Sequence, residues 1–397
     1  MTLHKTDEAL GFLPLPGDAG KPITVVGTDA IRDNFDEMCL QQALNSRMAP
    51  GVTDVILNPD GHAGYGAPVG CVMVSPTHIY PGPVGVDIKC SMSLLQLDIP
   101  EDAIADKVGQ LGSYGGGNHF GECEITRVND RPSMQATADS FGLKDGHVSF
   151  LSHCGSRGFG NLLAMAQFKD LERKFEKWST PYPSGDKKLV YAPLGTPEAD
   201  AYLDDMALGA NFATVNHLLI NALVLEAFQE ILPGAKGRLV YFISHNIARE
   251  EIIDGRKNWV HRKGATRAIP GGHFSLAGTP FAETGHPILL PGNPRDGSVV
   301  MVAKAGAERS AWSVNHGAGR QMGRKHAART LDQKSVDADF DAHDILSNCR
   351  KYPIDEAPDA YKNFPEVLRS VESAGLAETV AKLQARFVIK DEAAADD

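Results

Sequence analysis

Short runs of β-branched and other apolar residues recur along this chain, each bounded by Gly, Pro, Asp or His. Five of them, typical of strands, are ITVVG, TDVILN, HVSFLS, LVYFIS and GSVVMVA. Apolar residues at helical spacing predict long helices over 159–178 and 199–232, and the region from IDEAPDAYKNF to ARFVIK predicts two short helices and a final strand. Strands and helices do not alternate regularly, which excludes a doubly wound parallel sheet and predicts an irregular α+β fold.

The bulk properties exclude several classes of protein. No apolar run approaches the roughly 20 residues that a membrane span needs, and acidic residues interrupt the N-terminal stretch MTLHKTDEALGF, so we expect a cytoplasmic protein. Six scattered cysteines without a CxxC pair predict no disulfide framework. A net charge of -11 argues against coating nucleic acid by bulk electrostatics but allows a local basic site. The acidic tail DEAAADD, residues 391–397, is expected to be disordered.

Several residues with metal-binding side chains follow or precede these apolar runs. Taken alone, His153 and His245 each fit a buried core imidazole better than a ligand. Together, an oxygen, a sulfur and three nitrogen donors suit a borderline divalent ion such as Mn, Zn, Co or Fe. The set comprises Asp87, Cys90, His119, His153 and His245. Five ligands exceed one tetrahedral shell, which predicts two metals that share a thiolate and favours phosphoryl chemistry.

Positive charge is concentrated near the same motifs. The segment VHRKGATRAIPGG holds Arg262, Lys263 and Arg267 among Gly and Pro, which favours a phosphate-binding loop over a solvated face. Arg157 and Arg320 each stand four residues after a histidine. The stretch VNHGAGRQMGR leaves its histidine open to three interpretations: a core residue, a metal ligand or a nucleophile.

In order along the chain, these motifs resemble the RtcB family of RNA ligases. The matching stretches are NPDGHAGYGAPVG, GVDIKC, GGGNHFGE, SHCGSRGFG, GANFATVNH, SHNIARE, HRKGATRA, NHGAGR, EAPDAYKN and VIK. The resemblance implies one α+β ligase domain over 1–397 that uses GTP and two Mn²⁺ ions. It also implies RNA ends as partners, with DNA 3'-phosphate ends and an accessory activating protein as further expectations. The reaction implied joins an RNA 3'-phosphate or 2',3'-cyclic phosphate to a 5'-hydroxyl.

The resemblance also implies roles for single residues. It assigns Asp87, Cys90 and His119 to one manganese, and Cys90, His153 and His245 to the other. His316 is implied as the nucleophile that becomes joined to GMP, with Asp60 and Arg157 as further catalytic residues. The residues that it implies for nucleotide binding are Asn118, Glu122, Asn246, Gly317, Ala318, Gly319, Arg320 and Lys390.

This chain departs from the family pattern in several places. Near Asp87 it has Val86 in place of a tyrosine and Lys89-Cys90-Ser91 in place of asparagine-cysteine-glycine. Residues 291–297 read PGNPRDG, with a charged insertion in the nucleotide loop, and the region between Cys90 and Gly115 is much shorter than usual, so a helical subregion that helps to hold RNA is expected to be missing. These departures keep a dinuclear metal phosphoesterase open as an alternative, and a non-catalytic sensor of RNA ends as a second one. A covalent guanylate adduct would distinguish the ligase from both.

Overall fold

The computed structural model describes residues 1–18, 20–100 and 118–390, which form an α+β fold. The tail 391–397, the glycine run 115–117 and most of the short region before it lie outside the described residues. The helices are α1 (Asp29–Arg32), α2 (Glu37–Arg47), α3 (Pro132–Phe141), α4 (Arg157–Trp178), α5 (Pro197–Ile231), α6 (Arg324–Thr330), α7 (Gln333–Ala342) and α8 (Phe364–Ser373). The two long helices that the sequence predicts are therefore confirmed as α4 and α5.

Two large mixed sheets organise the part of the chain that the structure describes. The first is seven-stranded, with the order β1 (His4–Lys5), β2 (Leu10–Leu13), β3 (Ile23–Val26), β4 (Asp54–His62), β5 (Val69–Ser75), β13 (Arg256–Lys263) and β12 (Asn246–Ile253). The second has the order β11 (Gly237–Ser244), β7 (Ser91–Pro100), β9 (His147–Cys154), β8 (Phe120–Val128), β19 (Ala377–Ile389), β16 (Gly297–Ala303) and β15 (Pro287–Asn293). The five predicted strand runs are confirmed as β3, β4, β9, β11 and β16.

Shorter strands accompany these two sheets. β18 (Leu346–Ser347) lies parallel to β19, and two small ladders pair β14 (Ala265–Arg267) with β17 (Ser313–Asn315) and β6 (His78–Ile79) with β10 (Ala192–Pro193). The β14–β17 ladder carries the histidine motif VNHGAGR at its end, because β17 finishes one residue before His316.

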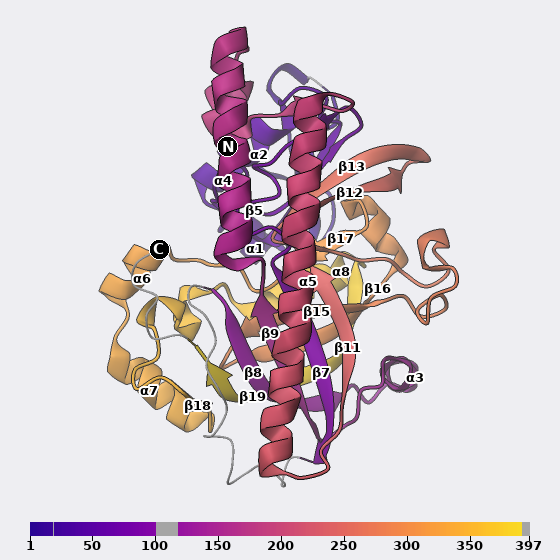
Figure 1. The fold of residues 1–397 in the computed structure, drawn as a ribbon, viewed down its shortest axis with the longest axis vertical. Helices are drawn as coiled ribbons and strands as arrows, with labels where there is room; N and C mark the ends of the chain where they lie inside the picture. Colours follow the sequence, from indigo (N-terminus) through magenta and orange to yellow (C-terminus); the bar gives the residue numbers. More distant parts are fainter. Residues whose placement is uncertain (19, 101–117, 391–397) are drawn as a thin grey trace.

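Apolar side chains from both sheets form one continuous core. Ile56 and Val72 of the first sheet belong to the same buried cluster as Leu290 and Met301 of the second. In a separate apolar cluster on the second sheet, Phe228 and its neighbours on α5 pack against β7, β8 and β9. In Figure 1, α5 runs vertically across the view with β7, β9 and β11 behind it. Burial of these apolar surfaces fixes how the strand ends are placed relative to one another.

Helix α5 differs from the expectation in one respect. It is long and apolar enough to cross a membrane by length and composition, although the sequence analysis expects no such segment, and 28% of its most apolar window is buried. Core helices of globular proteins meet the same criteria. The buried face of α5 packs on the second sheet and on α4, so the helix forms part of this fold.

The C-terminal region corrects one prediction. In place of a second short helix after α8, the chain enters strand β19 at Ala377 and remains extended to Ile389. This strand lies between β8 and β16 and forms hydrogen-bonded ladders with both. Pairing on both edges outweighs the weak helical spacing of AETVAKL, since helix propensity is a weak prior that tertiary context overrides.

Candidate active site

Strand order brings the predicted metal ligands to one edge of the second sheet. In the antiparallel ladders, His153 near the end of β9 lies opposite Met92 near the start of β7 and opposite Phe120 at the start of β8. Likewise, Ser244 at the end of β11 lies opposite Ser91 at the start of β7. Cys90 and His119 immediately precede β7 and β8. They therefore lie beside His153, near the end of β9, and His245, just after β11.

The ligand atoms form two overlapping clusters. The Sγ atom of Cys90 lies 3.0 Å from Nε2 of His153 and 3.6 Å from Nε2 of His119. Nε2 of His119 lies 3.0 Å from Oδ2 of Asp87. Asp87, Cys90 and His119 form one group and Cys90, His153 and His245 the other, with the ligand atoms of each group within 4.8 Å of one another. Cys90 belongs to both groups, the position that a bridging thiolate requires.

The protonation chemistry of these clusters suits a cation. Burial lowers the pKa of His153 and of His245 well below the ordinary histidine value, so both rings are neutral and carry lone pairs. Nδ1 of His245 is buried without a hydrogen-bond partner among the described residues. Burial is the larger cause that raises the pKa of the Cys90 thiol, and the nearby carboxylate of Asp87 raises it further. A divalent cation would reverse that effect, because a coordinating thiol loses its proton.

The turn after β9 holds Asp87 against the start of α4. The backbone amide of Ser156 donates to Oδ1 of Asp87 over 3.2 Å. A Cβ atom at Gly155 would collide with the same carboxylate, so only glycine allows this close approach. At the first position of α4, the guanidinium of Arg157 donates to Nδ1 of His119. Arg157 therefore lies directly against a predicted metal ligand.

A buried carboxylate orients His316. Oδ2 of Asp60 accepts hydrogen bonds from Nδ1 of His316 over 2.8 Å and from its backbone amide over 3.3 Å, and Asp60 is fully buried. A Cβ atom at Gly319, whose φ is 75°, would collide with the Asp60 backbone. The His316 ring also packs on that of His245, with centroids 4.6 Å apart. With Nδ1 committed to Asp60, Nε2 is the nitrogen that carries the free lone pair.

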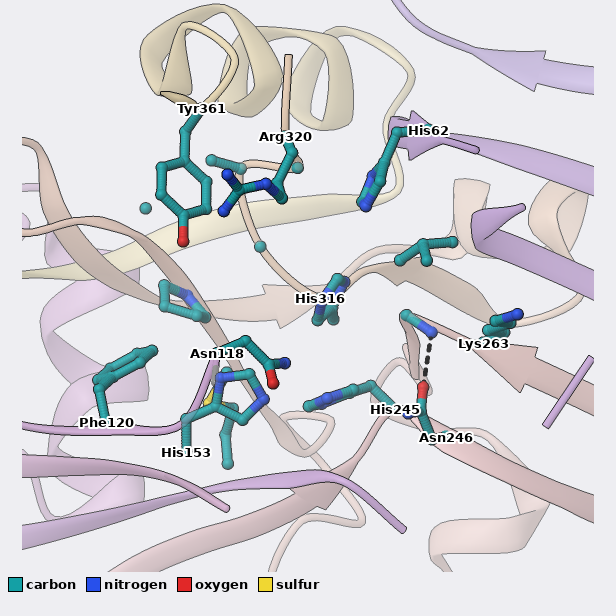
Figure 2. Close-up of a pocket in the computed structure, with 18 of the residues that line it drawn as sticks. His62, Asn118, Phe120, His153, His245, Asn246, Lys263, His316, Arg320 and Tyr361 are labelled. Carbon is teal, nitrogen blue, oxygen red and sulfur yellow. Dashed lines mark hydrogen bonds between the residues drawn. The ribbon is translucent and has the colours of Figure 1, made fainter. Parts of the chain in front are cut away.

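His316 lines a cavity of about 300 Å³ together with His153 and His245, two members of one metal-ligand cluster. Figure 2 shows His316 between the labelled side chains His153 and His245 on one side and Arg320 and Tyr361 on the other. The predicted site residues that line this cavity are Asn118, His153, His245, Asn246, His316, Gly317, Ala318, Gly319 and Arg320. Within it, Asn246 accepts a hydrogen bond from the Gly264 amide over 2.9 Å, while its own amide donates to the Asp87 carbonyl.

A smaller adjoining pocket contains the remaining nucleotide-binding candidates, Glu122 and Lys390. The ammonium of Lys390 lies 3.0 Å from Oε2 of Glu356, and Nη1 of Arg320 lies 3.1 Å from Oε1 of the same carboxylate. Burial raises the pKa of Glu122 to about 7. Tyr361 lines both pockets and donates to Glu356, so this glutamate connects the two cavities.

The basic segment at 260–267 corrects a second prediction. Arg262 is fully buried, and its two terminal nitrogens each donate to Glu251 over 2.8 Å. Lys263 donates to the backbone carbonyls of Tyr65 and Ala67. Arg262 and Lys263 lie in β13, a strand paired on both edges, rather than in a loop. The prediction of a phosphate-binding loop is therefore wrong for Arg262, although Lys263 does line the larger cavity.

The charged insertion at 291–297 forms the β15–β16 hairpin. Nη1 of Arg295 contacts Asp339 of α7 at 3.3 Å and Asp359 at 3.0 Å, so these ion pairs hold its charge against neighbouring elements. Pro291 and Gly292 line both cavities. Despite the insertion, Pro291 and Gly292 of this loop therefore lie beside the residues predicted to bind the nucleotide.

The sequence analysis gave no role to three residues of the site, His62, Glu356 and Tyr361, although each lies in a matching stretch. His62 follows Asp60 by two positions on β4 and lines the larger cavity. Spacing on a strand could have indicated it, because residues i and i+2 share a face. Glu356 and Tyr361 follow no regular strand or long helix, and no local pattern could have connected them to Lys390.

The fold and the site together define a class of protein. It is an α+β protein in which a histidine held by a buried carboxylate lies beside two overlapping groups of side chains that could hold metal ions, an arrangement suited to metal-assisted phosphoryl transfer. A family model described as tRNA-splicing ligase RtcB matches residues 42–111 and 100–391. The chain belongs to the RtcB family.

Individual relatives agree with this assignment. The tRNA-splicing ligase RtcB of Nanoarchaeum equitans is 29% identical, over 98% of this chain and 99% of the relative. That of Thermococcus kodakarensis is 29% identical, over 88% and 90% respectively. The corresponding ligase of Pyrococcus horikoshii is 36% identical over 71% of this chain but only 33% of its own length.

Proposed function

We propose that this chain is an RNA ligase that joins a 3'-phosphate or 2',3'-cyclic phosphate end to a 5'-hydroxyl end through a histidine–GMP intermediate. The observation that carries the proposal is the hydrogen bond between Asp60 and His316, which frees Nε2 of the histidine beside the metal-ligand clusters. Relatives named tRNA-splicing ligase support the same reaction class.

The chain's own residues account for the first chemical step. Nε2 of His316 attacks the α-phosphorus of GTP, and pyrophosphate leaves with the electron pair of the broken P–O bond. The imidazole becomes positively charged as the N–P bond forms, and the Asp60 carboxylate stabilises that charge through Nδ1. A 2',3'-cyclic phosphate is first opened by water to a 3'-phosphate. The GMP is then transferred to the RNA 3'-phosphate, and attack by the 5'-hydroxyl on the activated end expels GMP.

Two manganese ions fit the donor set described above. Asp87, Cys90 and His119 would hold one ion and Cys90, His153 and His245 the other. Bound there, the ions supply charge neutralisation for phosphoryl groups. The protein's contribution is to keep the histidine rings neutral and the ligand atoms together before binding.

The two cavities suggest how the substrates are arranged. We assign the triphosphate to Asn118, Asn246 and the backbone of 317–319 with Arg320, and the guanine to the pocket of Glu122 and Lys390. Arg157, next to His119, is assigned to the RNA 3'-phosphate. We further propose that residues 1–397 act as one ligase domain in the cytoplasm, on RNA ends or DNA 3'-phosphate ends, with an accessory activating protein.

Labelling with GTP tests this function. The full chain is incubated with GTP labelled at the α-phosphate and Mn²⁺, then separated under denaturing conditions. The wild type should retain label, and His316→Ala should retain none. As a phosphoramidate, the adduct should be labile in acid and stable in alkali. A wild type that forms no adduct but releases phosphate from RNA 3' ends would contradict the ligase assignment and favour a metal phosphoesterase.

A further inference from the structure

His62 is a pocket residue without a role in the reaction as described so far. It ends strand β4 two positions after Asp60, the residue that orients His316. Its ring lines the larger cavity, and Figure 2 shows it directed toward the interior of that cavity. His62 therefore faces the space where substrates of His316 would react.

The hydrogen bonding of His62 fixes its tautomer. Its Nδ1 lies 2.8 Å from the backbone carbonyl oxygen of Asp60. A carbonyl oxygen only accepts hydrogen bonds, so Nδ1 carries the proton and Nε2 carries the lone pair. Within residues 1–18, 20–100 and 118–390, Nε2 has no hydrogen-bond partner of its own. Burial lowers the pKa of His62 to about 4, so the lone pair is available at neutral pH.

The other described nitrogen groups that line the cavity have other roles or partners. His153 and His245 belong to the metal clusters, and His316 is the nucleophile. The Lys263 ammonium already donates to two carbonyls, and arginine does not lose its proton in proteins. Among the described lining residues outside the metal clusters, His62 and His316 carry the uncommitted basic nitrogens, and His62 is the one without another role in the reaction.

The chemistry of the proposed reaction needs such a nitrogen in one step. His316 attacks GTP with a lone pair, and the RNA 3'-phosphate takes up GMP as an anion, so neither nucleophile must lose a proton. The 5'-hydroxyl differs, because its oxygen carries a proton that must leave as the phosphodiester forms. A base within hydrogen-bond reach accelerates such a step by about 10²- to 10⁴-fold.

We propose that Nε2 of His62 is the general base that accepts the proton of the 5'-hydroxyl in the joining step. The oxygen forms the new P–O bond, and the bond between the 3'-phosphate and GMP breaks, with GMP taking the electron pair. The proton on Nε2 then passes to solvent. This assignment rests on the proposed ligase function and adds a catalytic residue to it.

The test separates the three steps in the full chain. An RNA with a 3'-phosphate, an RNA with a 5'-hydroxyl, GTP and Mn²⁺ are mixed, and the protein–GMP adduct, the guanylylated RNA end and the joined RNA are followed in time. His62→Gln places a neutral amide near the position of Nε2 and lacks the basic nitrogen. It should form the adduct and the activated end at wild-type rates, accumulate the activated end and join it about 10²-fold more slowly.

Two further variants keep the result interpretable. His62→Ala should regain part of its joining rate when imidazole is added, because free imidazole can occupy the vacated space and accept the proton. His273→Gln, on a surface turn that does not line the cavity, should behave as the wild type. Joining at the wild-type rate in His62→Gln, or equal loss of adduct formation and joining, would overturn the assignment. A wild type without any adduct would instead overturn the ligase function itself.

Discussion

Asp60 and His316 lie 256 positions apart in the sequence, yet the Asp60 carboxylate accepts hydrogen bonds from both the ring and the backbone amide of His316. The double contact fixes the ring's orientation as well as its tautomer. The imidazole then presents Nε2 to the cavity while Nδ1 keeps its proton, a division of roles that a nucleophilic histidine requires.

Asp60→Asn tests this orientation. An asparagine amide would donate toward Nδ1 and so favour the tautomer in which Nε2 carries the proton, which removes the attacking lone pair. We expect adduct formation from α-labelled GTP to fall by about 10²- to 10⁴-fold. Asp54→Asn, on the same strand but paired with Lys21, is the control and should label normally. Full labelling of Asp60→Asn would show that the tautomer does not limit the reaction.

Cys90→Ala tests the bridging assignment. Cys90 is the member that both ligand groups share, so its loss leaves two ligands in each. After equilibration with Mn²⁺ and removal of free metal, elemental analysis should find neither ion retained by this variant. Cys123→Ala, which alters a buried thiol of β8 in the apolar core, should keep the wild-type metal content. Retention of one ion by Cys90→Ala would mean that the two sites are held independently.

Glu356→Gln tests how the ion pairs of buried Glu356 with Lys390, Arg320 and Arg324 contribute to stability, and how that contribution depends on pH. Burial acts to raise the pKa of Glu356, but Lys390, Arg324 and Arg320 outweigh it and lower the value from 4.5 to about 2. A depressed carboxyl pKa contributes stability above pH 4.5 that is lost as the pH falls toward 2. The difference between these two pKa values corresponds to about 3 kcal/mol of unfolding free energy at pH 7.

Urea unfolding at several pH values measures this effect. The free energy of unfolding of Glu356→Gln should lie below that of the wild type by about 3 kcal/mol at pH 7, and the gap should narrow from pH 4.5 downward. Glu308→Gln, which alters an exposed carboxylate, should show little change at any pH. A gap that stays constant with pH would assign the loss to packing rather than to charge.

Arg262→Ala tests the corrected view of the basic segment. Removing Arg262 takes the bidentate partner from the largely buried Glu251 and leaves Arg267 as its ion-pair partner, a loss of about 3 kcal/mol or less. The variant should therefore unfold at lower denaturant concentration, whereas the exposed Arg249→Ala should not. If Arg262→Ala kept wild-type stability and lost RNA binding, the original phosphate-binding interpretation would be restored.

Local sequence patterns were sufficient for much of the fold. The β-branched runs became strands and the two long apolar periodicities became α4 and α5, because alternation and helical spacing act over a few residues. The same local reasoning failed for β19, whose extended conformation depends on two neighbouring strands. It also failed for Arg262, because a cluster of charges in the sequence does not reveal a carboxylate on the next strand.

The sequence by itself determined which donor atoms the chain offers and that they stand at the ends of apolar runs, since residue type and local spacing are sufficient for both. Only the tertiary structure decided which donors meet. The order β11-β7-β9-β8 brings Cys90, His153 and His245 together, and the packing of the two sheets buries Asp60 beneath His316. These contacts join residues far apart in the chain, and their formation depends on strand pairing and apolar burial over the whole fold, which no local pattern encodes.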